Sequence, residues 1–313
     1  MHNFIKQTAL ELGFDACGIA KATALTEDAE FMQQWLNDGK HGEMQYMARN
    51  FEKRTDPRVL VPGCKSVVVV LLNYFSEKAQ PISAPKIARY AYSAVDYHTV
   101  LKTKLKQLED KIVTQYGADT VNSLHQHSFV DSAPVLERRW AERAGLGWIG
   151  KHTQLIAQGI GSYCFIGILM LNVETVYDNP IANKCGTCTR CIDHCPTKAL
   201  NGRSIDARRC ISYQTIEYKN TVDSEIQNLL SGCALGCDIC AEVCPWNKKW
   251  AKPHNHTELK PVEEIFEWKK EDWQKLESEK FNNIFRQSAI KRAGFQKLKE
   301  NIQFVIQNKD KMS

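Results

Sequence analysis

The 313-residue sequence predicts an α/β (α+β) domain built on a mixed sheet, an iron–sulfur domain of the bacterial ferredoxin type and a short helical end. In the first part, β-branched runs alternate with amphipathic helices, which is typical of layered α/β folds. In the second, nine of the twelve cysteines fall between Cys185 and Cys244, without long apolar periodicity. Such a segment needs inorganic cross-links to fold. We therefore divide the chain into residues 1–180, 181–250 and 251–313.

Composition and charge are those of an ordinary globular protein. The chain is 43% hydrophobic and 25% charged, with 41 Lys and Arg against 36 Asp and Glu, which excludes a disordered or fibrous chain. The N-terminus lacks the apolar core of a secretory signal, and the longest apolar run, Val67 to Leu72, is too short for a membrane helix. We expect a cytoplasmic monomer, in which cysteines are metal ligands or catalytic thiols rather than disulfides.

The secondary structure expected in the first domain follows from hydrophobic pattern and turn residues. A β-branched run without polar interruption predicts a strand buried on both faces, and apolar residues at helical spacing predict a helix that ends at a glycine. In chain order we expect a helix at the N-terminus, a strand from Ser66 to Phe75, a helix through Leu101, Leu105, Leu108 and Ile112 that ends at Gly117, a short strand from His127 to Asp131, a helix from Pro134 to Gly145, and a strand from Tyr163 to Val173.

The first cysteine motif is Cys185-x2-Cys188-x2-Cys191-x3-Cys195-Pro196. This is the spacing with which bacterial ferredoxins hold [4Fe–4S] clusters: three thiolates converge on one cube and the fourth binds a second cube. A zinc site would need only the paired cysteines, not the Cys-Pro ending. The motif therefore predicts two iron–sulfur clusters.

The second motif, Cys237-x2-Cys240-x3-Cys244-Pro245, lacks its first cysteine. By the crossover of the fourth ligand, the first cluster takes Cys185, Cys188, Cys191 and Cys244. The second takes Cys195, Cys237, Cys240 and either Cys210 or Cys233, and the spacing leaves that choice open. The three scattered cysteines are expected to be small buried side chains of the core; they are Cys17, Cys64 and Cys164.

Asp131 is the best-placed candidate for acid–base chemistry. It follows the apolar pair Phe129-Val130 and precedes a predicted helix. Asp131 can be the N-cap of that helix, or it can be a general acid whose pKa is raised by its apolar neighbours, so that it stays protonated near neutrality. The sequence alone leaves both interpretations open.

Two further motifs carry less weight. Asp96-Tyr97-His98 matches the D-x-H start of a cobalt-binding loop found in some cobalamin enzymes, but Leu101 stands where that loop has a glycine, so His98 is expected to open a helix. Gly145-x-Gly147-x-x-Gly150-Lys151 imitates a dinucleotide fingerprint but follows a predicted helix instead of a strand. We interpret it as a helix end followed by a glycine turn.

Positive charge is concentrated at the C-terminal end. From Lys280 to Ser313 there are two acidic residues, Glu300 and Asp310, and eight basic ones. This excess fits either a solvated helical face or a surface that contacts phosphates. The basic residues are Lys280, Arg286, Lys291, Arg292, Lys297, Lys299, Lys309 and Lys311.

Seven segments together resemble the epoxyqueuosine reductase family, over roughly residues 15 to 295. They read KRTDPRVLVPGCKSVVVV, DYHTVL, DSAPVLERRWAERAGLGWIGKHT, CGTCTRCIDHCPTKAL, RCISYQTIE, GCDICAEVCPWN and FRQSAIKRAG. The resemblance implies a cobalamin-dependent enzyme, related to reductive dehalogenases, that reduces the epoxide of epoxyqueuosine in the tRNA anticodon loop to queuosine. It also implies base-off cobalamin between residues 1–180 and the ferredoxin-like domain.

The resemblance also implies roles for individual residues. Asp131 would donate the proton to the opening epoxide, and Cys210, in RCISY, would be the fourth ligand of the second cluster. The implied cobalamin contacts are Arg54, Tyr97, His98, Asp131, Lys151, His152, Thr153, Leu155, Ser212 and Asp238. Trp246 and Tyr213 are guesses for stacking on anticodon bases, although each fits a core position better.

The resemblance leaves the electron donor unidentified. Many members of the family continue into a HEAT-like helical domain, whereas this sequence stops soon after FRQSAIKRAG. Any tRNA contact made by that extension is expected to be absent here or replaced by the basic segment from Lys280. Two alternative functions are considered. One is a respiratory reductive dehalogenase, although these proteins usually carry a twin-arginine signal. The other is a two-cluster electron carrier, which would not explain the function of the first 180 residues.

Overall fold

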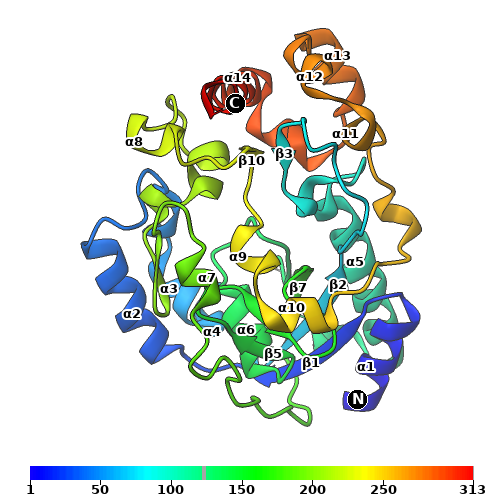
Figure 1. The fold of residues 1–313 in the computed structure, drawn as a ribbon. Helices are drawn as coiled ribbons and strands as arrows, with labels where there is room; N and C mark the ends of the chain where they lie inside the picture. Colours follow the sequence, from blue (N-terminus) through cyan, green and yellow to red (C-terminus); the bar gives the residue numbers. More distant parts are fainter. Residues whose placement is uncertain (122–124, 313) are drawn as a thin grey trace.

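The computed structural model describes residues 1–121 and 125–312, and their side chains as far as Asn308 (Figure 1). Its centre is a four-stranded sheet in the order β1-β2-β7-β4. Both long predicted strands are confirmed. The sheet strands are β1 (Ala16–Lys21), β2 (Ser66–Asn73), β7 (Cys164–Leu171) and β4 (Ser128–Phe129).

All pairings within this sheet are antiparallel, so the prediction of a mixed sheet is wrong in that respect, although the α/β class holds. Lys21 pairs with Ser66 and Asn73 pairs with Cys164. Each long connection therefore returns to the end of the sheet that it left, instead of crossing over to the opposite end. An alternation of strands and helices in the sequence does not distinguish antiparallel from parallel strands. The two differ in whether each connection crosses to the opposite end of the sheet, which the sequence pattern does not show.

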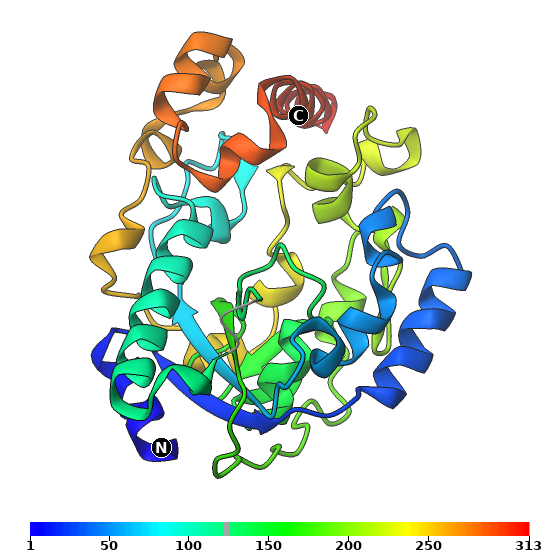
Figure 2. The same ribbon diagram turned by 180° about the vertical axis from the view of Figure 1, so that it is seen from behind.

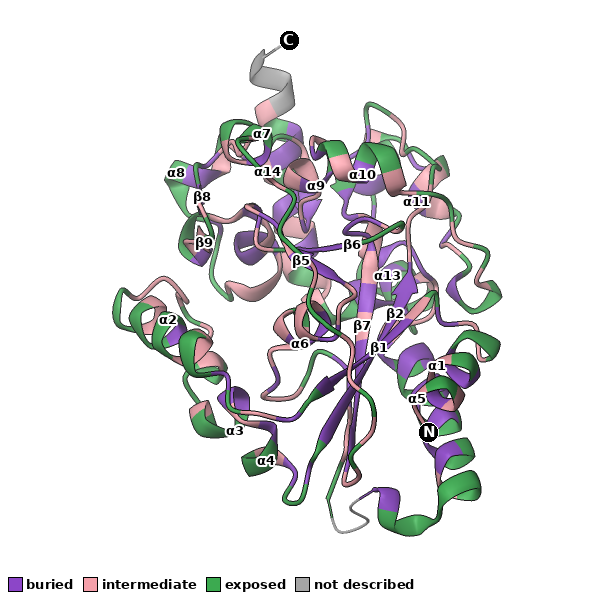
Figure 3. Cartoon of the chain, turned by 90° about the horizontal axis from the view of Figure 1, so that it is seen from below, coloured by how far each residue is buried: buried purple, intermediate pink, exposed green. Residues whose placement is uncertain are grey.

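The sheet is covered on both faces, as Figures 2 and 3 show. Every residue of β2 is buried, as the β-branched run predicts. Val68, Val70 and Leu72 pack toward α1 (His2–Glu11) and α5 (Tyr97–Tyr116). The alternate residues pack toward α6 (Glu137–Arg143). This sandwich fixes the positions from which the site residues project.

Two predicted helix ends can be compared with the structure. The end of α5 at Gly117 is confirmed, and the backbone there has φ 93°, a conformation that favours glycine. The start of α6 at Pro134 is wrong, because the helix begins at Glu137. Residues 132–135 instead form tight turns, in which Val135 N–H donates to the carbonyl of Ala133, and residues that precede a proline disfavour helical geometry.

Short elements complete the first 180 residues. β1 and α2 (Thr26–Asn37) had no clear sequence signal. The remaining helices and strands are α3 (Phe51–Thr55), α4 (Pro57–Leu60), β3 (Lys86–Ile87), β5 (Gly147–Ile149) and β6 (Leu155–Ala157).

The cysteine-rich segment consists of short helices and turns, as expected from its lack of periodicity. α7 lies within the first motif and contains Cys191, and it packs against α9, which lies within the second motif and contains Cys240. Its elements are α7 (Arg190–Asp193), β8 (Leu200–Asn201), β9 (Ser204–Ile205), a π-helical turn (Tyr213–Glu217), α8 (Ser224–Gln227), β10 (Cys233–Leu235), α9 (Ile239–Glu242) and α10 (Pro245–Trp250).

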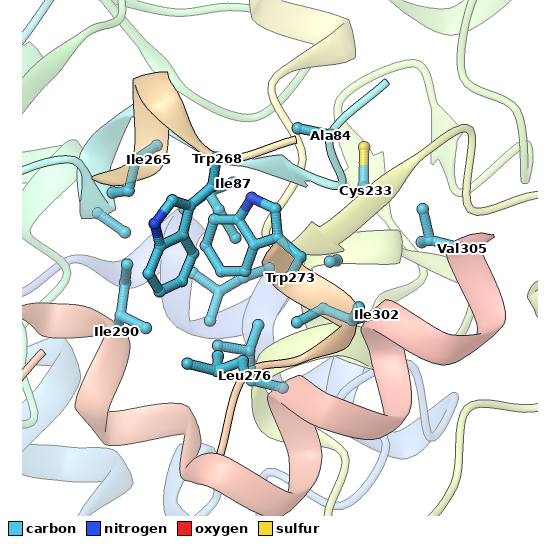
Figure 4. Close-up of a cluster of buried hydrophobic side chains, with 14 of the residues drawn as sticks. Ala84, Ile87, Cys233, Ile265, Trp268, Trp273, Leu276, Ile290, Ile302 and Val305 are labelled. Carbon is cyan, nitrogen blue, oxygen red and sulfur yellow. The ribbon is translucent and has the colours of Figure 1, made fainter. Parts of the chain in front are cut away.

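The C-terminal helices share one core with both preceding segments. Figure 4 shows Trp268 and Trp273 packed among Ile290, Ile302 and Cys233. β10 also pairs in parallel with β3 from the first segment. The helices are α11 (Glu264–Glu267), α12 (Lys270–Gln274), α13 (Ser278–Ile284) and α14 (Phe295–Met312). Among the described residues, no helix has both the length and the apolar character needed to span a bilayer.

Replacing Ile302 by alanine is expected to destabilise the fold by about 2–5 kcal/mol, because its side chain is 0% exposed and its loss leaves a cavity. Chemical denaturation measures the difference. The neighbouring exposed variant Gln303→Ala is the control and should change stability by less than about 0.5 kcal/mol. Equal effects of the two variants would contradict the assigned core.

Candidate active site

Several of the nine clustered cysteines lie near one another in the structure. Burial raises the pKa of Cys191 to about 11, and the neighbouring thiols of Cys244 and Cys185 add to this effect. Cys244 is also influenced by Cys188, which completes the first group. These four are the thiols that the crossover rule assigns to one cluster.

The second group contains the remaining ligands. Burial raises the pKa of Cys210 to about 11, with contributions from Cys237 and Cys195. Burial also raises the pKa of Cys240, with contributions from Cys237 and Cys210 and a smaller one from Cys191 of the first group. Cys233 hydrogen-bonds to Cys237, but its side chain lies in the apolar core of Figure 4. Cys210 therefore has more of the other ligands as neighbours than Cys233 has.

These thiols do not surround a single metal ion. Among the described residues, no three His, Cys, Asp or Glu side chains converge closely enough to ligate one ion. Thiolates that bind a cube each reach a different iron, so their sulfurs stay apart at separate corners. Of the three cysteines predicted to be core, Cys17 and Cys64 are buried and Cys164 is half-buried.

Asp131 lies at the centre of a polar cluster. Its Oδ2 accepts a hydrogen bond from the Tyr97 hydroxyl at 3.2 Å and lies 3.2 Å from Nε2 of His98. Asp96 caps α5 and holds Nδ1 of His98 at 2.7 Å. The Tyr97 ring is stacked on Phe165 at 4.1 Å, which fixes its hydroxyl. Two carboxylates therefore flank one imidazole, and His98 opens a helix as predicted.

The N-cap interpretation of Asp131 is wrong, since α6 begins six residues later with Leu136 as its N-cap. Asp131 instead has φ 54°, a left-handed backbone that turns its side chain toward α5. The expected rise in its pKa is also wrong. The hydrogen bond from His98 lowers the pKa of Asp131 against the opposing effect of burial. The side chain is 61% exposed, so apolar surroundings do not dominate.

The two carboxylates raise the proton affinity of His98. Burial lowers the pKa of His98, but the hydrogen bonds to Asp131 and Asp96 outweigh burial and raise it above its ordinary value. Arg292 Nη1 lies 2.8 Å from both ring nitrogens and opposes that rise. The pair thus shifts in opposite directions: the pKa of Asp131 is lowered and that of His98 is raised.

A pocket of about 320 Å³ opens beside the Asp131 turn. Its lining includes Val130 and Ser132, the neighbours of Asp131, together with Lys102 and His125. The side chains of Tyr97, His98 and Asp131 do not line this pocket, which adjoins the cluster through the backbone neighbours of Asp131 and has the cationic Lys102 in its lining.

Buried polar atoms without protein partners occur at ten described positions, several of them in segments that resemble the family. They include Nε of Arg54, Oε1 of Glu137 and Nε2 of His152. Such atoms are rare in native proteins and call for a ligand or water. The His152 ring is 1% exposed, burial lowers its pKa to about 4, and its Nδ1 accepts from Gln154 N–H, so Nε2 carries the free proton.

Glu137 is also suited to donate a hydrogen bond to a ligand. Burial raises the pKa of Glu137 to about 8, so it is protonated at neutral pH and can donate a hydrogen bond. The neutral donors of Glu137 and His152, with the cation of Arg54, suit a ligand rim rich in amide groups, such as that of a corrin. Arg54 and His152 are two of the predicted cobalamin contacts.

Other predicted contacts already have protein partners. Lys151 Nζ donates to the carbonyl of Gly186 at 2.8 Å, and Asp238 accepts the backbone N–H of Arg89 at 2.8 Å. The Thr153 carbonyl accepts from Arg138 at 2.6 Å. Leu155 is buried in β6, and Ser212 is half-buried at the start of the π-helical turn.

The two residues suggested for base stacking, Tyr213 and Trp246, have other neighbours. Tyr213 is buried, and its hydroxyl accepts from Glu43 N–H at 2.8 Å. Trp246 packs with Trp148 and Trp250 against ligands of the first cluster. Neither residue is among the described partners of Asp131.

Several basic side chains of the C-terminal end make internal contacts. Lys299 donates to the carbonyls of Gln274 and Leu276, Lys297 donates to that of Asn220, and Lys280 lies over the Trp268 ring. Arg286 and Lys291 are exposed. Lys309 and Lys311 lie outside the residues whose side chains are described.

Cysteines spaced for two redox clusters, in one chain with a carboxylate–imidazole pair that can move protons, indicate the class of iron–sulfur oxidoreductases. Residues 184–247 match the family described as "4Fe-4S double cluster binding domain", so this segment belongs to a type that binds two [4Fe–4S] clusters. Residues 54–132 match "Epoxyqueuosine reductase QueG, DUF1730".

Similarity to individual proteins extends over nearly the whole chain. It is 44% identical to the epoxyqueuosine reductase of Cellulophaga algicola, over 97% of each chain. It is 46% identical to that of Leadbetterella byssophila, over 96% of this chain and 97% of the relative. A crystal structure of epoxyqueuosine reductase with an epoxyqueuosine-modified tRNA-Tyr stem loop superposes with TM-score 0.86 and 28% identity, covering 98% of this chain and 80% of the other. The chain belongs to the epoxyqueuosine reductase family.

Sequence reasoning missed two residues of the site, Arg292 and Glu137. Both lie within segments quoted for the resemblance, FRQSAIKRAG and DSAPVLER. Arg292 was counted only as part of the basic end, and its contact with His98 depends on how the C-terminal helices fold back. Glu137 could have been singled out as an acidic residue next to an apolar pair, Val135-Leu136.

The variant Asp131→Asn should lower the pKa of His98, because it removes the negative charge that favours the imidazolium. NMR titration of the histidine ring measures this pKa. Because folding raises the pKa of His98, its stabilising contribution is complete below the ordinary histidine pKa and is lost as pH rises through the raised value.

Asp110→Asn is the control for this titration, since Asp110 is exposed on the same helix and pairs with Lys106. An unchanged His98 pKa in Asp131→Asn, or an equal change in the control, would contradict the described pair.

Proposed function

We propose that this protein reduces the epoxide of epoxyqueuosine in the tRNA anticodon loop to queuosine. Family membership supports the reaction, and the similar crystal structure contains an epoxyqueuosine-modified stem loop. The observation that carries the proposal is the Asp131–His98 pair beside a pocket, in a chain with a double-cluster domain. The two-cluster carrier and the reductive dehalogenase explain this combination less well.

The cofactor that this reaction requires is cobalamin, proposed here in its base-off form. Arg54, Glu137 and His152 would hold its amide-bearing rim, since their buried polar atoms have no protein partner among the described residues. The other predicted contacts, from Lys151 to Asp238, remain part of the proposal. When bound, cobalamin supplies a low-potential cobalt centre, which is chemistry that no protein side chain provides.

The clusters would deliver electrons to that cofactor. The proposed ligands of the first are Cys185, Cys188, Cys191 and Cys244, and those of the second are Cys195, Cys210, Cys237 and Cys240. Two clusters held by crossed motifs lie close enough for electrons to pass between them.

Asp131 would protonate the oxygen of the opening epoxide. Conversion of the epoxide to an alkene and water consumes two electrons and two protons, so proton supply matters as much as electron supply. Because the pKa of Asp131 is lowered, it must first receive a proton from His98, at 3.2 Å. Tyr97 would hold the carboxylate in place during the transfer.

The tRNA anticodon loop is the proposed partner, since single-stranded bases can be splayed into a pocket. Lys102, at the rim of the pocket beside Asp131, can contact a phosphate. A cytoplasmic location and a monomeric state remain part of the proposal.

Asp131→Asn should lower turnover by roughly 100-fold or more, the usual contribution of a positioned general acid. The assay incubates reduced, cofactor-loaded protein with epoxyqueuosine-containing tRNA and measures queuosine by nucleoside mass analysis. Iron, sulfide and cobalamin contents should be unchanged. Asp110→Asn is the matched control and should keep full activity. Wild-type turnover in Asp131→Asn would remove Asp131 from the reaction.

Cys210→Ala should lower the iron and sulfide content by about half, because one of two clusters loses a ligand. Cys233→Ala is the matched variant and should retain both clusters. Metal analysis and electron paramagnetic resonance of the reduced protein distinguish the two. The reverse result would make Cys233 the fourth ligand.

A further inference from the structure

Three tryptophans pack directly against ligands of the first cluster. Trp148, Trp246 and Trp250 form one hydrophobic cluster with Cys185 and Cys244. Trp148 is buried, whereas Trp246 and Trp250 are half-buried and reach the surface. The indole of Trp246 also donates to the carbonyl of Lys184 at 3.2 Å, which ties it to the loop before Cys185. An apolar patch therefore reaches from the surface to the first cluster.

Positive charge surrounds this patch. Lys184 Nζ lies 5.9 Å from the centre of the Trp148 ring, and Lys249 Nζ lies 5.7 Å from that of Trp246. Residues 181–198 and 245–252 contain one acidic residue, Asp193, against six exposed basic ones. Glu242, nearby in α9, is paired with Arg89 at 2.6 Å. The basic residues are Lys184, Arg190, Lys198, Lys248, Lys249 and Lys252.

The first predicted cluster is the one whose proposed ligands, Cys185 and Cys244, pack in the tryptophan patch, although all four cysteines of the second group are half-buried. Between residues 182 and 190, every residue other than the two cysteines is exposed. The second group instead adjoins the interior, since Cys237 packs against the core shared with the C-terminal helices. Figure 3 shows α7, α9 and α10 together along the upper edge of the molecule. An electron that enters through the tryptophan patch would therefore reach the first cluster.

We propose that this patch, with its tryptophan centre and lysine rim, docks an acidic one-electron carrier protein. The inference rests on the proposed first cluster. An apolar aromatic centre within a charged rim is the usual anatomy of a protein interface, and complementary charge accelerates the encounter. In the step itself the carrier loses one electron and the cluster gains one, with no bond formed or broken.

The alternative occupant, tRNA, fits this patch less well. In the described part of the chain, the partners of Asp131 come from α5, not from α7, α9 or α10. Base stacking needs free ring faces, whereas Trp246 and Trp250 are packed together at 4.7 Å and Lys249 covers Trp246. A carrier protein can dock on the exposed edges of the tryptophan rings without separating them.

The test measures reduction of the clusters without tRNA or cobalamin. Reduced flavodoxin, an acidic carrier, is mixed with the oxidised protein, and bleaching of the iron–sulfur absorbance is followed by stopped flow. The double variant Lys248→Glu/Lys249→Glu should slow this reaction by roughly tenfold or more at low salt, the scale of electrostatic steering. Added salt should slow the wild type and leave the variant little changed.

Two controls make the result specific. Lys21→Glu/Lys111→Glu changes the net charge equally at exposed positions outside α7, α9 and α10 and should react like wild type. Reduced methyl viologen, a small cation, should reduce both variants at the wild-type rate or faster.

Equal rates with flavodoxin in wild type and Lys248→Glu/Lys249→Glu would overturn the proposal, and so would loss of tRNA binding without loss of flavodoxin reactivity. A wild type that is reduced rapidly but fails to convert epoxyqueuosine would count against the proposed function alone.

Discussion

The antiparallel pairing of β4 with β7 is the constraint on which the site depends. β7 is held by β2, whose eight residues are all buried between two helical layers. β4 is only two residues long, yet this register places the following turn, with Asp131, beside the first turn of α5. The acid–base cluster therefore inherits its geometry from the most deeply buried part of the fold.

The features predicted correctly are those that depend on residues close together in the sequence. The spacing from Cys185 to Cys195, the β-branched strand β2 and the end of α5 at Gly117 each depend on residues close in sequence. Strand direction was not predictable, because it depends on where connections of tens of residues return. The pKa of Asp131 was predicted with the wrong sign, because its controlling neighbours, Tyr97 and His98, come from another helix.

The basic C-terminal end shows why composition alone is ambiguous. Lys297 and Lys299 bind backbone carbonyls, while Arg292 extends to the ring of His98. A count of charges treats these side chains as equivalent. Lys297 and Lys299 stabilise packing, whereas Arg292 opposes the rise in the pKa of His98. The contacts are set by the shared core around Trp268 and Trp273.

The hairpin formed by β1 and β2 has an evolutionary consequence. Because Lys21 and Ser66 are paired, residues 22–65 leave and rejoin the sheet at one point and form an excursion from an otherwise ordinary hairpin. Such excursions tolerate changes in length at small entropic cost. This one carries Arg54 in α3, within a segment that resembles the family, so changes in length are expected in the part of the excursion before α3. Such changes leave the register of the sheet as it is.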